Sequence, residues 1–198
     1  MKNTVIVKEY GLPEINREAL LRYMRAGNTD EKIDELIDKC ISESIYSFRY
    51  SVCYTITDFE VKKNKVYFDH FTVNSASLSE NLAGSDSAVI FGATIGIGID
   101  RLINKYSRLS PAKALCIQAI GAERIETLCD VFNKEMNSKF IYTKNRFSPG
   151  YGDFDIVYQK DIFAILDCPK RIGLTLNSSL MMSPSKSVTA IIGFKREE

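Results

Sequence analysis

The chain has 198 residues, of which 45% are hydrophobic and 26% charged, and its formal net charge is +1. Such a composition is typical of a globular domain that is long enough to bury a core of its own. The small net charge, without a basic run interleaved with aromatic residues, argues against nucleic-acid binding and against an anionic membrane surface.

No stretch of about 20 apolar residues is present, so no transmembrane helix is expected. The residues up to Tyr10 also lack the apolar run of a signal peptide. The five cysteines form no C-x-x-C pair, and His70 is the single histidine. We therefore expect a cytoplasmic protein with reduced thiols and without a metal site.

The first 50 residues predict two helices. Leu12-Pro13-Glu14 is typical of a helix start, and apolar residues follow at helical spacing as far as Met24. From Ile33 to Ile45, apolar residues recur at i, i+3 and i+4, which is the clearest amphipathic pattern in the chain. Residues 1–50 are thus predicted to form a helical N-terminal part.

The hydrophobic period then changes from 3.6 to 2, which indicates strands. Ser51 to Phe59 and Lys65 to Val73 are predicted to form a hairpin around the turn signal Lys63-Asn64. A short helix is expected from Ser77 to Ala83, and a buried strand from Ala88 to Ile97. The glycines of that strand follow the order G-x-x-x-G-x-G, so they do not match the dinucleotide-binding fingerprint.

Ser110-Pro111 is a strong helix opening, and the helix is predicted to run to about Asn137. The remaining segments predict a short helix at residues 156–166 and three strands, at residues 140–143, 172–176 and 187–194. Helices and strands are intermixed, and the hairpins favour antiparallel pairing. We therefore predict an α+β fold in one domain, residues 1–198, in which residues 51–198 form a largely antiparallel sheet flanked by helices.

The loop at residues 146–153 is the most unusual segment and the best candidate for a binding site. Gly150 and Gly152 allow the backbone to approach a ligand closely. Arg146 can hold a carboxylate through two parallel hydrogen bonds, and Tyr151 offers a flat apolar face. The alternative interpretation is a tight turn closed by an ion pair of Arg146 with Asp153 or Asp155.

The pattern Arg146-x-x-x-Gly150-Tyr151 resembles the R-x-x-x-G-Y motif of the activation domain of cobalamin-dependent methionine synthase. The resemblance continues in Gln159-Lys160, in residues 173–176 and in the closing region around Met182-Ser183-Pro184. Residues 92–96 and 109–112 resemble the small, stand-alone bacterial members of this family. The similarity covers nearly the whole chain and is firmest from residue 146 to residue 193.

The resemblance implies that the chain binds S-adenosylmethionine and supports the reductive methylation of cobalamin in a methionine synthase that acts in trans. By this similarity, Arg146 holds the ligand carboxylate, Ser148 makes backbone contacts, Gly150 permits close approach, and Tyr151 lies near the methyl donor. Glu126 is a further candidate, for the ligand's ammonium group. The chain lacks an Asp-x-His-x-x-Gly segment, so the corrinoid is expected on a partner protein, with a flavodoxin-like protein as electron donor.

This chain departs from the family pattern at three places. The glutamate of a Thr-Glu-Ser segment is replaced at Asn177 or Ser178, the tryptophan beside the turn proline is Ser183, and a Tyr-Pro pair is Tyr151-Gly152. These departures favour an alternative function, a docking module of another corrinoid methyltransferase system without S-adenosylmethionine chemistry of its own.

A third hypothesis is an independent methyltransferase for another small acceptor. The loop offers only Asp153 and Asp155 as a base for such a reaction. We therefore expect a component of methionine synthase activity rather than an independent enzyme.

Overall fold

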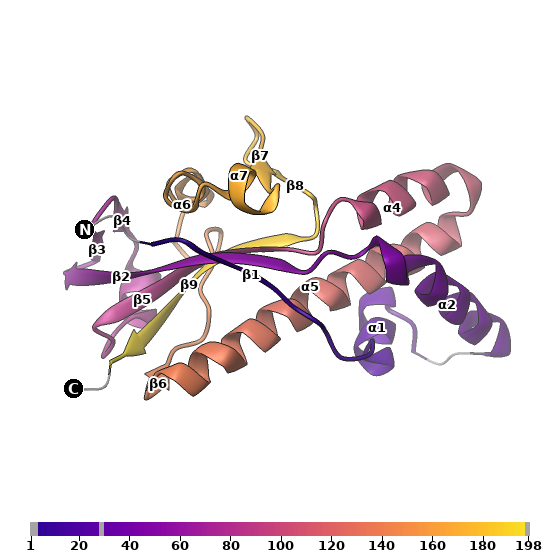
Figure 1. Cartoon of the computed structure of the whole chain (residues 1–198), viewed down its shortest axis with the longest axis horizontal. Coiled ribbons are helices and arrows are strands. Elements are labelled where there is room, and N and C mark those ends of the chain that lie inside the picture. The colour runs from indigo at the N-terminus through magenta and orange to yellow at the C-terminus, as the bar shows by residue number, and fades with distance from the viewer. Residues whose placement is uncertain (1–3, 28–29, 197–198) are drawn as a thin grey trace.

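The computed structural model describes residues 4–27 and 30–196, so both ends of the predicted domain, 1–198, lie outside the described residues. One twisted sheet forms the centre, and helices cover both of its faces (Figure 1). The prediction of an α+β fold with a largely antiparallel sheet flanked by helices is confirmed. None of the described helices is both long and apolar enough to cross a membrane.

The strands of the main sheet follow the order β4-β3-β2-β5-β9-β6. Strand β1 pairs with β2 along the same edge of β2 as β3 does. All of these pairings are antiparallel. A separate small hairpin is formed by β7 and β8. The described strands are β1 (Ile6–Glu9), β2 (Ser51–Lys62), β3 (Lys65–Phe68), β4 (Thr72–Asn74), β5 (Ser87–Thr94), β6 (Tyr142–Thr143), β7 (Thr175–Leu176), β8 (Met182–Ser183) and β9 (Ser187–Lys195).

The helices gather on the two faces of the sheet and at the end where α5 extends beyond it (Figure 1). The described α-helices are α1 (Arg17–Met24), α2 (Glu31–Ser44), α3 (Ala76–Asn81), α4 (Gly98–Leu109), α5 (Pro111–Lys139), α6 (Gln159–Leu166) and α7 (Cys168–Ile172). Two 3-10 turns, η1 (Ile45–Ser47) and η2 (Ile156–Tyr158), lead into β2 and α6.

The long helix α5 lies against one face of the sheet and carries the larger core. Phe132 of α5 packs its ring against Tyr54 of β2 and Phe91 of β5. The N-terminal half of α5 continues past the sheet, where α1, α2 and α4 pack around it (Figure 1). This arrangement leaves the C-terminal half of α5 beside the segment that follows β6.

The opposite face of the sheet is covered by α6, α7 and the loop at residues 147–154. Cys53 of β2 and Cys168 of α7 are both buried there, with their sulfur atoms 3.8 Å apart. A side chain at Gly92 of β5 would lie only 3.2 Å from the Cys168 sulfur, so the glycine lets α7 approach the sheet closely.

The prediction of a helical N-terminal part is incomplete, because residues 6–9 form strand β1 along the edge of β2. The first helix also begins later than predicted, after Asn16, whose side chain accepts a hydrogen bond from the Ala19 amide. The carbonyl groups of Pro13 and Glu14 instead accept hydrogen bonds from Arg124, which holds this segment outside the helix.

Three other expectations need correction. The helix α4 was not predicted, and the single strand expected from Lys65 to Val73 is broken into β3 and β4, with His70 exposed at the turn between them. Much of the strand expected at residues 172–176 is the end of α7 and a glycine turn. The predicted long helix, the buried strand and the hairpin at residues 63–64 are confirmed.

Candidate functional site

The loop at residues 146–153 is fixed to the sheet at its beginning. Phe147 exchanges two backbone hydrogen bonds with Ile191 of β9, at 2.8 and 2.9 Å between nitrogen and oxygen. The Phe147 ring stacks on the buried ring of Phe154, which follows the loop. Both ends of the loop are therefore anchored in the core, and its middle is held between them.

Two glycines with positive φ shape the middle of this loop, at +97° for Gly150 and +54° for Gly152. The Gly150 amide donates to the Phe154 carbonyl at 2.6 Å, and the Tyr151 amide donates to the Ser148 carbonyl at 3.0 Å. These bonds close a compact turn that leaves the Tyr151 side chain exposed at its tip. The ring of Tyr151 makes an edge contact with the Phe147 ring.

Asp153 ends the loop and ties it to α3. Its carboxylate accepts hydrogen bonds from the Ser75 hydroxyl and from the amides of Ala76 and Ser77, at 2.5, 2.8 and 3.0 Å. Because three donors favour the ionised form, they hold the pKa of Asp153 well below its ordinary value. The predicted alternative, an ion pair of Arg146 with Asp153, is therefore wrong. Asp155 is also engaged elsewhere, since it accepts from the Val157 amide.

Arg146 instead faces α5, where it pairs with two carboxylates one helical turn apart. Its Nη1 donates to Asp130 at 2.9 Å, and its Nη2 donates to Glu126. The exposed fractions of the side chains are 20% for Arg146, 43% for Glu126 and 63% for Asp130. Burial alone would lower the pKa of Arg146, but the bond to Asp130 and the charge of Glu126 keep it above its ordinary value.

Two further side chains border this charged cluster. Cys129 of α5 is buried close enough to Arg146 to feel its charge, and burial raises the pKa of its thiol to about 12. Tyr23 of α1 lies near Glu126, and burial together with that carboxylate raises the pKa of the phenol. Sequence reasoning missed Tyr23 and Asp130, because both reach the cluster from helices that are distant from the loop along the chain and, unlike Glu126, neither was implied by the family resemblance.

The structure thus places the candidate residues in two neighbouring groups, a charged cluster and the turn that follows it. Arg146 and Glu126 are in direct contact, and Asp130 adds a second carboxylate to them. Ser148, Gly150 and Tyr151 form the turn that follows. A guanidinium beside two carboxylates can bind a zwitterion, since each charge of such a ligand finds an opposite charge.

A cavity of about 590 Å³ lies elsewhere. It is bounded by the segment before α1, the end of α2 and Arg124, and none of its lining residues belongs to the loop. No group of three or more potential metal ligands occurs among residues 4–27 and 30–196.

Comparison with known proteins gives one family and one fold. The family model for the activation domain of vitamin B12 dependent methionine synthase matches residues 62–197, which include α5 and the loop. A solved structure described as the MetH reactivation domain bound to AdoHcy is similar, with a TM-score of 0.69 and 13% identity. The match covers 100% of this chain and 80% of that chain, and at this identity it establishes the fold alone. No curated protein matches the sequence.

Proposed function

Because the chain belongs to the family of vitamin B12-dependent methionine synthase activation domains, we propose that it binds S-adenosylmethionine through Arg146, Ser148, Gly150 and Tyr151. In this proposal it is a reactivation subunit, acting in trans on a methionine synthase that carries the cobalamin. The observation that supports it most directly is the Arg146–Glu126 contact inside the region that the family model matches.

The charged cluster fits the amino-acid end of S-adenosylmethionine. A guanidinium has five N–H donors, and Asp130 and Glu126 engage its Nη1 and Nη2. No hydrogen bond joins the Arg146 Nε to the described part of the chain, so this edge can receive the ligand carboxylate. Glu126 then lies where it can accept from the ligand ammonium group.

The turn supplies the remaining contacts in this proposal. The positive φ of Gly150 exposes its backbone without a side chain in the way. The exposed ring of Tyr151 offers an apolar face beside the ligand. When bound, S-adenosylmethionine would supply the methyl group for a corrinoid held by the partner, with an electron from a flavodoxin-like donor. The residues of this chain bind and orient the methyl donor.

Calorimetry of the whole chain with S-adenosylmethionine tests the binding step. We expect the wild-type chain to bind and Arg146→Ala to bind about 10- to 100-fold more weakly, because a charge-assisted contact contributes about 1.5–3 kcal/mol. Arg171→Ala, which removes an exposed cation from α7, is the matched control. Equal affinity of Arg146→Ala and the wild-type chain would contradict the proposed site.

The action in trans needs a second experiment. A cobalamin-dependent methionine synthase core that has been inactivated by oxidation is supplied with a reductant, S-adenosylmethionine and this chain. Methionine formation should recover with the wild-type chain and not with Arg146→Ala. Recovery without the chain would show that the proposed partner does not need it.

One observation favours the alternative docking module. Asn177, near the position where long family members have a glutamate, turns its Oδ1 into the β7–β8 turn and accepts from the amides of Ser179 and Met181, both at 2.9 Å. This side chain therefore stabilises its own turn instead of facing a ligand. Recovery of a corrinoid protein in a pull-down by a chain that binds no S-adenosylmethionine would favour this function.

A further inference from the structure

The two carboxylates on α5 outnumber the cation that they contact. Glu126 and Asp130 lie one helical turn apart on the same side of the helix, and both pair with Arg146. The cluster of these three side chains, which we call the loop–helix cluster, therefore carries a net charge of −1. Asp130 is its most exposed member, with 63% of its side chain accessible.

S-adenosylmethionine carries a carboxylate, an ammonium group and a sulfonium, so its net charge is +1. Its demethylated product, S-adenosylhomocysteine, has the same amino-acid end and the same nucleoside but a neutral thioether. A site that neutralised only the amino-acid end would not distinguish the two ligands by charge. A site with one surplus negative charge attracts the sulfonium form more strongly.

We propose that Asp130 is the residue that selects the sulfonium of S-adenosylmethionine over the thioether of S-adenosylhomocysteine. This inference rests on the proposed function of the same site. Glu126 is more enclosed and faces Arg146 and Tyr23, which suits the ammonium group. The sulfonium sulfur is four bonds from the ammonium nitrogen of the ligand, and in an extended ligand this span is comparable to the rise of one helical turn, about 5.4 Å. Asp130 lies one turn beyond Glu126.

The ratio of the two affinities isolates this effect. Asp130 also pairs with Arg146, so its removal changes how the guanidinium receives a ligand carboxylate. That change is the same for both ligands and cancels in the ratio. For charges a few ångströms apart at a solvent-exposed site, we expect Asp130 to account for about a threefold to tenfold preference.

The experiment is calorimetry of S-adenosylmethionine and S-adenosylhomocysteine, each at low salt, with the full chain and its variants. Asp130→Asn should lower the preference for S-adenosylmethionine about threefold to tenfold, and Asp130→Glu should keep it. Glu126→Gln should weaken both ligands and lower the preference less than Asp130→Asn does, because Glu126 lies one helical turn farther from the sulfonium. Asp69→Asn, at the exposed turn between β3 and β4, removes the same charge from a side chain outside the loop–helix cluster and should leave the ratio unchanged.

Rising salt concentration gives a second readout. The preference of the wild-type chain should shrink with salt, whereas that of Asp130→Asn should stay nearly constant. A ratio unaltered by Asp130→Asn, or altered equally by Asp69→Asn, would overturn this inference while Arg146-dependent binding left the proposed function intact. A wild-type chain that binds neither ligand, or binds both independently of Arg146, would overturn the two proposals together.

Discussion

Glu123 and Arg124, adjacent residues of α5, pair their charged groups inside the protein, where their side chains are only 2% and 3% exposed. Arg124 also donates to the carbonyl groups of Pro13 and Glu14, at 2.7 and 3.2 Å. Glu123 accepts from the amide of Asn16 at 3.1 Å. This buried pair therefore fastens the segment before α1 to the long helix.

Breaking this pair should destabilise the chain strongly. We expect Glu123→Gln and Arg124→Met each to lower the free energy of unfolding by about 3–5 kcal/mol, because each leaves a buried partner without its counter-charge or its hydrogen bonds. The double variant Glu123→Gln/Arg124→Met should lose less free energy of unfolding than the sum of the losses in the two single variants. Urea denaturation of the four proteins measures this, and strict additivity would show that the two charges do not depend on each other.

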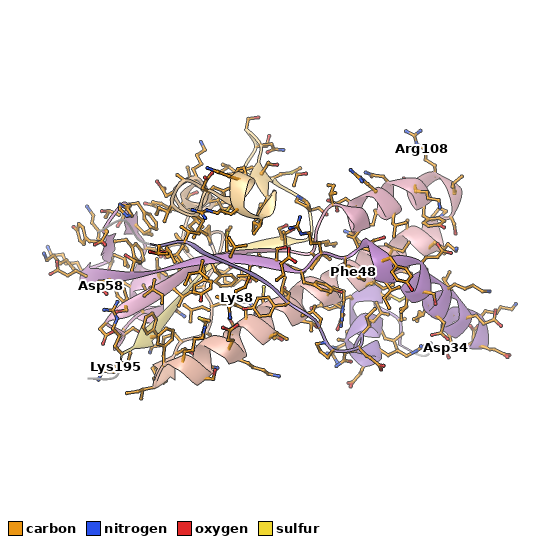
Figure 2. The ribbon with its side chains drawn as sticks, viewed as in Figure 1. Lys8, Asp34, Phe48, Asp58, Arg108 and Lys195 are labelled. Carbon is orange, nitrogen blue, oxygen red and sulfur yellow. The ribbon has the colours of Figure 1, made fainter. Side chains whose placement is uncertain are left out.

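A second polar network joins β1 to the end of α5 and predicts a pH dependence. Glu135 accepts hydrogen bonds from Lys8, labelled in Figure 2, and from Lys139 and Tyr10. Burial would raise the pKa of Glu135, but these donors outweigh it and hold the pKa at about 2.

We expect Glu135→Gln to lower the free energy of unfolding by about 1 kcal/mol at pH 7, since part of the network is screened by solvent. The folded pKa lies below the unfolded value of about 4.3. The contribution of the carboxylate is thus complete above that pH and is lost as the pH falls toward 2. Urea midpoints at pH 7, 5 and 3 should converge for the two proteins, and a constant difference would speak against a role of ionisation.

The central elements could be predicted from the sequence because their patterns are local. The apolar run of β5 and the serine–proline opening of α5 mark a buried strand and a long helix without any knowledge of the fold. Strand β1 gave no such signal, since it is four residues long and its apolar residues Ile6 and Val7 remain exposed. Only the edge of β2 makes these residues a strand.

The helix α4 had a readable signal that the glycines before it obscured. Ile99, Leu102, Ile103 and Tyr106 follow helical spacing, and all four pack into the core. The partners of Arg146 had no such local signal, and Glu126 was a candidate only through the resemblance to the activation-domain family. Asp130 and Glu126 lie 16 and 20 residues earlier in the chain, and only the packing of α5 against the segment after β6 brings them to the loop.

Gly152 should tolerate no side chain. Its φ of +54° disfavours other residues, and an added Cβ would lie 2.5 Å from the Ser77 hydroxyl oxygen and 2.9 Å from the Ser77 Cβ. We expect Gly152→Ala to lower the free energy of unfolding by about 2–4 kcal/mol, from backbone strain and from overpacking.

Gly84→Ala is the matched control for this change. Gly84 also has a positive φ, +81°, but a Cβ there meets nothing within 4 Å. Gly84→Ala should lower the free energy of unfolding by about 1 kcal/mol, which is the cost of the backbone conformation alone. If thermal or urea unfolding gives the same loss for both variants, the contact between the loop and α3 does not restrict position 152.

Asp153 should hold the loop in its conformation through its charge. In Asp153→Asn the neutral amide keeps the shape but loses the charge-assisted bonds from Ser75, Ala76 and Ser77. We expect lower stability, faster hydrogen exchange of the amides at the start of α3, and weaker S-adenosylmethionine binding, because the turn at Gly150 and Tyr151 loses its anchor. Asp155→Asn is the control, since Asp155 accepts from one amide within the next turn.

The stability difference between the wild-type chain and Asp153→Asn should also depend on pH. The folded pKa of Asp153 is depressed, so its carboxylate stabilises the fold above the unfolded pKa of about 3.9 and loses that effect as the pH falls below it. The two proteins should therefore differ most at neutral pH and least in acid. Exchange rates at Ala76 and Ser77 that are equal in both proteins at pH 7 would mean that the backbone of the loop, rather than the Asp153 charge, keeps Tyr151 in place.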